Sequence, residues 1–64
     1  DRMQRVVEVV QEVVNRQRVK PSPKKMGMAV AELYQLEINH MSHEAGAGFE
    51  PSRHLGIIEA MFRK

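Results

Sequence analysis

Two proline-containing breaks divide the 64-residue chain into three segments, and this division limits its possible folds more than any other feature. The first break is Pro21-Ser22-Pro23 and the second is Glu50-Pro51-Ser52. Proline lacks a backbone N–H and interrupts helices and sheets, yet it is favoured at the first position of a helix. A serine followed by proline, as at Ser22, is a typical helix start. The breaks therefore predict three helices joined by turns.

The first segment, residues 1–17, repeats apolar residues at helical spacing. The residues of this stripe are Met3, Val6, Val7, Val10, Val13 and Val14. Valine also favours strands, but the polar residues collect on the opposite face, which the strict alternation of a strand would not give. We predict a helix here, with Val9 beside the stripe and widening the apolar surface.

The second segment is apolar around most of its circumference, and we predict a helix from residue 23 to about residue 44. One side carries Met26, Ala29, Val30, Leu33 and Leu36, and another carries Ala31, Tyr34, Ile38 and Met41. Such a helix is normally buried by more than one neighbour. Gly46 predicts its end, because glycine readily adopts the left-handed cap conformation. We expect Met28 to be exposed, because it projects toward the polar strip.

A third helix is expected over residues 52–64, with Glu50 or Ser52 as its cap. Its apolar stripe consists of Leu55, Ile58, Met61 and Phe62, with Ile57 beside it. The sequence thus predicts a single all-α domain over residues 1–64, in which an antiparallel hairpin of two helices is crossed by the third. Because residue 1 is Asp rather than Met, we expect a fragment of a longer chain or a processed product.

Composition excludes several classes of protein. The chain has no cysteine, which rules out a disulfide scaffold and a cysteine-based zinc site and fits an intracellular location. No apolar run approaches the length of a membrane span. A chain of 7.4 kDa hides only about 60% of its surface on folding. We therefore expect a partner or self-association, with a homo-oligomer as the simplest form.

The charges are segregated along the chain. Residues 15–25 contain five bases and no acid, whereas residues 26–52 contain four glutamates and no Lys or Arg. The bases of this basic segment are Arg16, Arg18, Lys20, Lys24 and Lys25. Three interpretations remain open: a solvated turn, a site for an anionic partner such as nucleic acid, or a dock for the acidic face of another copy.

The tetrapeptide Ser22-Pro23-Lys24-Lys25 resembles the minor-groove-binding repeat of linker-histone tails and the sites of proline-directed kinases. Histone tails use the motif in many copies, whereas it occurs once here, at a predicted helix start. Helix capping by Ser22 is therefore the preferred explanation. A phosphate on Ser22 would also sit favourably at a helix N-terminus beside two lysines.

Potential ligands for a metal ion lie along one edge of the second helix. Glu37, His40 and His43 share this edge, with Glu44 adjacent and His54 in the next segment. The spacing is not specific for zinc or for a di-iron centre, and histidines in the last turn of a helix are favoured by its dipole. No serine has the neighbours of a catalytic triad. We predict no metal, no cofactor, no catalytic residue and no enzymatic activity.

The predicted function is a helical protein-protein interaction or dimerisation module of a regulatory protein. The residues expected to contact the partner, another protein or a second copy, are Val9, Met28, Leu36 and Ile57. The basic segment would steer the encounter. The alternative is a nucleic-acid-binding domain in which the basic segment contacts phosphates. Its main defect is missing sequence specificity, because no helix presents a row of base-reading side chains.

Overall fold

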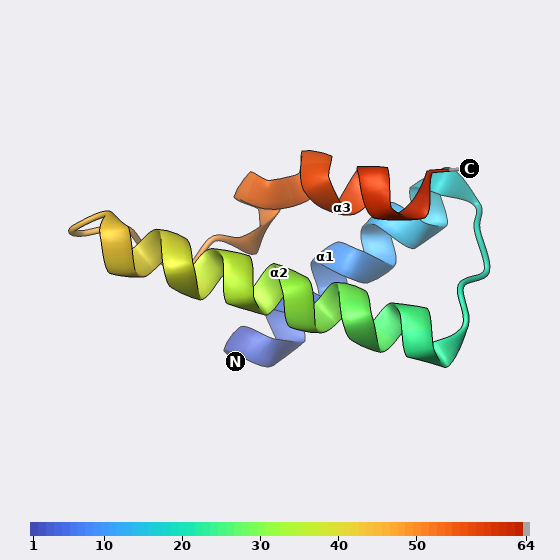
Figure 1. The fold of residues 1–64 in the computed structure, drawn as a ribbon, viewed down its shortest axis with the longest axis horizontal. Coiled ribbons are helices and arrows are strands. Elements are labelled where there is room, and N and C mark those ends of the chain that lie inside the picture. The colour runs from blue at the N-terminus through green and yellow to red at the C-terminus, as the bar shows by residue number, and fades with distance from the viewer. Residues whose placement is uncertain (64) are drawn as a thin grey trace.

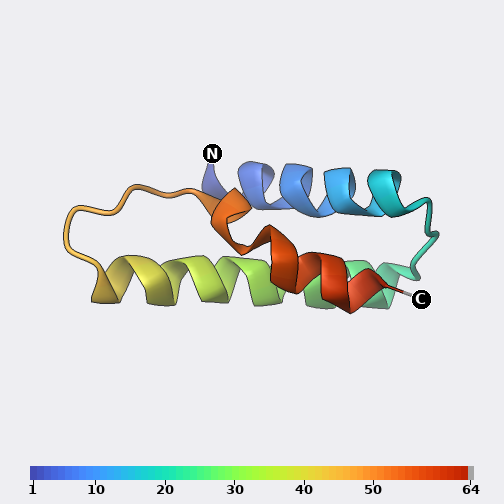
Figure 2. The ribbon, with the colours of Figure 1, turned by 90° about the horizontal axis from the view of Figure 1, so that it is seen from above.

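The computed structural model describes residues 1–63 and is all-helical over this range, as predicted (Figure 1). The elements are α1 (Arg2–Gln17), α2 (Pro23–His43), the 3₁₀ helix η1 (Pro51–His54) and α3 (Leu55–Phe62). Helices α1 and α2 lie side by side along the long axis, joined at one end by the short 18–22 connector, and α3 lies over both (Figure 2). The end of the third predicted helix, residue 64, lies outside the described residues.

Side-chain caps fix where α1 and α2 begin. The Asp1 carboxylate accepts a hydrogen bond from the Gln4 N–H at 2.8 Å. The Ser22 hydroxyl accepts one from the Lys25 N–H at 3.1 Å, and Pro23 occupies the first turn, which confirms the predicted start of α2. At the end of α1, Arg18 adopts the left-handed conformation with φ of 57°. The signals at Arg18 and Ser22 turn the chain sharply between the two helices.

The core lies where the three α-helices meet. Its buried residues are Val6, Val10, Val13 and Val14 of α1, Ala29 and Leu33 of α2, and Ile58 and Phe62 of α3. The stripe predicted on α1 is wrong at one edge: Met3 is 48% and Val7 41% exposed, whereas Val9 packs against the core. Val9 is covered because α3 lies against its side of α1. Arg16 follows Val9 by seven residues, which places it on the same face, and it reaches Glu59 of α3 at 3.4 Å.

The third helix differs from the predicted 52–64 helix. Its first turn is the 3₁₀ helix η1, and the α-helix begins only at Leu55 and ends at Phe62. The Arg53 N–H donates to the Glu50 carbonyl at 3.1 Å, which is the three-residue spacing of a 3₁₀ turn. This tighter turn coincides with contacts from Arg53 and His54 to Glu37 on α2, described below.

The connection from α2 to η1 contains the predicted glycine turn. Helix α2 ends at His43, and Gly46 follows with φ of 82° in a turn closed by the Ala47 N–H and the Glu44 carbonyl at 3.1 Å. Gly46 thus takes the predicted left-handed conformation, but beyond the helix cap and not at it. No helix within residues 1–63 combines the length and apolar character needed to cross a lipid bilayer.

Candidate functional site

The best-organised polar cluster surrounds Glu37, whose side chain is fully buried. Its carboxylate accepts hydrogen bonds from the Glu50 N–H at 2.6 Å and from Arg53 Nε at 2.9 Å, and His54 Nε2 lies at 3.0 Å. Arg53 also donates to the Gly48 carbonyl at 2.8 Å. We call the side chains of Glu37, Arg53 and His54 the Glu37 clasp, because they tie η1 and the loop before it to α2.

The clasp holds Glu37 in its ionised form. Burial by itself would raise the pKa of this carboxyl, since it penalises the charged form. The hydrogen bonds from the Glu50 N–H, Arg53 and His54, together with the positive charge of Arg53, outweigh burial and lower the pKa below its ordinary value. In the described part of the chain, no buried side-chain nitrogen or oxygen lacks a hydrogen-bond partner. The clasp is therefore a fully satisfied internal ion pair.

The histidines near the clasp have structural contacts. His43 Nδ1 lies 2.7 Å from the Asn39 carbonyl in the last turn of α2. The rings of His40 and His54 meet edge to face with centroids 6.0 Å apart. Within residues 1–63, no three His, Cys, Asp or Glu side chains are grouped so as to hold a metal ion, and no pocket is enclosed.

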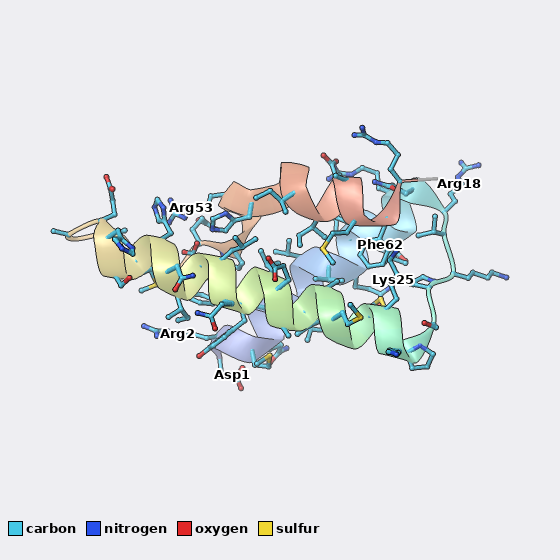
Figure 3. All side chains as sticks on the ribbon, viewed as in Figure 1. Asp1, Arg2, Arg18, Lys25, Arg53 and Phe62 are labelled. Carbon is cyan, nitrogen blue, oxygen red and sulfur yellow. The ribbon has the colours of Figure 1, made fainter. Side chains whose placement is uncertain are left out.

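The basic segment forms one end of the molecule, around the connector between α1 and α2; Figure 3 shows Arg18, Lys25 and Phe62 at this end. Its members differ in their surroundings. Arg16 is engaged by Glu12 at 3.6 Å and Glu59 at 3.4 Å, and the Lys25 ammonium lies 5.8 Å from the centroid of the Phe62 ring. The members with no carboxylate at ion-pair distance among residues 1–63 are Arg18, Lys20, Lys24 and Lys25.

The glutamates of residues 26–52 are only partly available to a partner. Glu37 is buried and pairs with Arg53 in the clasp, and Glu50 pairs with Arg5 of α1 at 3.2 Å. Glu32 and Glu44 are exposed and form no ion pair with any other described residue. Residues 26–52 therefore present two glutamates on the surface that are unpaired within the described chain, Glu32 and Glu44, and not the four that their composition implies.

The four predicted contact residues are not equally accessible. Met28 is 58% and Ile57 48% exposed, whereas Leu36 is half-buried and Val9 is half-buried against the core. Ile57 lies on the side of α3 away from α1, because α1 contacts Glu59, which follows by two residues and so lies on the opposite side of the helix. Met28 and Ile57 are thus the apolar side chains of this set that a partner could reach most fully.

No protein-family model, curated protein or solved structure matches this chain.

Proposed function

We propose that the chain is a small non-enzymatic helical module of a regulatory protein, built on an antiparallel α1–α2 hairpin crossed by α3, that associates with another protein or with a second copy of itself. The observation that carries this proposal is the exposure of Met28 and Ile57 on helices whose core is closed beneath them. Covering apolar side chains of this size with a partner removes apolar surface from water, which stabilises the complex.

The size of the domain supports the same proposal. A chain of 7.4 kDa exposes about 10,700 Å² when unfolded, and this chain still exposes 4,419 Å² when folded. Folding alone thus hides about 60% of the surface, which leaves a chain of this length with marginal stability. Association would bury more apolar area and raise its apparent stability.

The clasp supports a non-enzymatic role. A general acid or base needs to reach a substrate and to exchange a proton with it. The Glu37 carboxylate is fully buried, and Glu50, Arg53 and His54 occupy its oxygens. The group with the most perturbed environment in the described chain is therefore engaged in holding η1 to α2.

Replacing Met28 and Ile57 together with serine is expected to dissociate the oligomer without unfolding the chain. Both side chains are about half exposed, so their loss removes partner contacts and little of the core. Light scattering should show a wild-type mass of twice 7.4 kDa or more and a variant mass near 7.4 kDa, with similar melting temperatures.

The matched control is Val9→Ser, which is expected to lower the melting temperature because Val9 packs against the core. A wild-type chain that stays monomeric up to about 1 mM would contradict self-association, since this concentration already detects binding of only about 4 kcal/mol.

A second function, contact with nucleic-acid phosphates, is favoured by the unpaired members of the basic segment. Arg18, Lys20, Lys24 and Lys25 have no carboxylate partner among the described residues, unlike Arg16. Lys24 and Lys25 also lie in the first turn of α2, where the helix dipole adds positive potential. These charges would attract phosphates without reading bases.

Binding to a generic DNA duplex across a salt series tests this second function. Neutralisation of about four phosphates predicts a log-log slope of about −3.6. The double substitution of Arg18 and Lys20 by glutamine should reduce the slope by about half. Arg2→Gln is the control, because Arg2 lies over Phe49, away from the basic segment, and should leave the slope unchanged. No binding at low salt would rule out this function.

A further inference from the structure

We propose that the outer face of α2 binds a second copy of this chain, with the two α2 helices antiparallel about a twofold axis that passes beside Met28. This inference rests on the dimerisation function proposed above and specifies its interface. It is carried by the order of three side chains along α2: a base at Lys24, an apolar residue at Met28 and an acid at Glu32.

The three residues form one exposed stripe. They follow one another at intervals of four residues, which places them on the same side of a helix. Met28 precedes the buried Leu33 by five residues, about 140° around the helix from the core side. Lys24 and Glu32 are exposed and Met28 is 58% exposed. In Figure 2, no other described helix covers the outer side of α2.

The two charges of the stripe have no partner inside the described chain. Lys24 and Glu32 are about 12 Å apart along the helix axis, too far to pair with each other. Neither residue forms an ion pair with any of residues 1–63. Arg5, Arg16 and Arg53, by contrast, all pair with glutamates.

A twofold axis makes this stripe complementary to itself. In an interface of two identical patches, residue i contacts residue j, and residue j contacts residue i. If Met28 meets Met28 of the second copy, each Lys24 lies opposite Glu32 of the other chain. Two ion pairs then flank an apolar contact. Parallel helices in register would instead oppose Lys24 to Lys24 and Glu32 to Glu32, so the charge order selects the antiparallel arrangement.

A second copy fits this face better than an unrelated helix. An unrelated partner would have to place an acid opposite Lys24, an apolar residue opposite Met28 and a base opposite Glu32, at the same spacing. The chain itself supplies that order by symmetry. The stripe spans only two turns of α2, so the dimer is expected to be weak and to depend on protein concentration.

Charge reversal provides the test. Each of the variants Lys24→Glu and Glu32→Lys turns both ion pairs into like-charge contacts, and each is expected to raise the dimer dissociation constant about tenfold. The double variant K24E/E32K should restore the wild-type constant, because it exchanges the two charges. An equimolar mixture of the two single variants should form a heterodimer as tight as the wild-type dimer. Sedimentation equilibrium over a range of concentrations measures all four.

Glu44→Lys is the control, because Glu44 is exposed beyond the end of α2 and its reversal should leave the constant unchanged. A wild-type dimer that neither single reversal weakens would overturn the α2 interface while leaving dimerisation intact. So would a double variant as weak as the single ones. A wild-type chain that remains monomeric would overturn both the interface and the self-association from which it is inferred.

Discussion

The variant Glu37→Ala is expected to lose about 3 kcal/mol of unfolding free energy, since it removes one partner of a buried ion pair. Its carboxylate accepts from Glu50 and Arg53 and lies against His54, so the alanine variant leaves these groups without their acceptor. A chain of this length has a total stability of about 3–10 kcal/mol. The substitution should therefore remove about a third of the stability or more. Urea titration followed by circular dichroism should show this loss as a lower midpoint of unfolding.

The matched control is Glu8→Ala, which removes an exposed glutamate. Among residues 1–63, its side chain accepts only a 3.4 Å hydrogen bond from Gln4. Its effect should stay within about 0.5 kcal/mol. Glu37→Gln should be intermediate, because an amide keeps an acceptor for the Glu50 N–H but lacks the charge that Arg53 requires. Equal stabilities for Glu37→Ala and Glu8→Ala would show that the clasp contributes nothing to the fold.

The features of the fold that could be predicted from sequence are those set by neighbouring residues. Ser22 and Pro23 mark the start of α2 because the capping hydroxyl and the N–H that it accepts from, that of Lys25, are only three residues apart in the sequence. The spacing of Val6, Val10 and Val13 identifies the buried side of α1 for the same reason. The exposure of Met28 followed from its place on the polar strip of α2.

The Glu37 clasp could not be predicted in this way, although part of its signal is present. Glu37 follows Leu33 by four residues and Ala29 by eight, so it continues the buried stripe of α2. A charge at that position indicates a buried ion pair. Its partners, Arg53 and His54, lie 16 and 17 residues away and reach it only because the chain folds back through the intervening loop. The same tertiary contact accompanies the 3₁₀ turn that shortens the third helix.

The second large effect is expected on acidification, because protonation of Glu37 breaks the clasp without any mutation. The pKa of Glu37 in the folded chain lies below its ordinary value of 4.5. The ionised carboxylate therefore favours folding. Its contribution is fully present above the unfolded pKa and is lost as the pH falls through the folded pKa. The contribution of Glu37 to the free energy of unfolding should stay constant from neutral pH to about pH 5 and should decrease below about pH 4.5.

The pH dependence of Glu37→Gln separates this carboxylate from the other acids. Glutamine lacks the negative charge that pairs with Arg53, so the variant should be less stable than the wild type at about pH 7. Because glutamine does not titrate, the variant should also lose less stability between about pH 5 and pH 3. The difference in unfolding free energy between the two proteins should thus shrink as the pH falls. A constant difference across this range would mean that the pKa of Glu37 is the same in the folded and unfolded chains. The stability supplied by the clasp would then not depend on the charge of Glu37, and the fit of the carboxylate among Glu50, Arg53 and His54 would have to supply it.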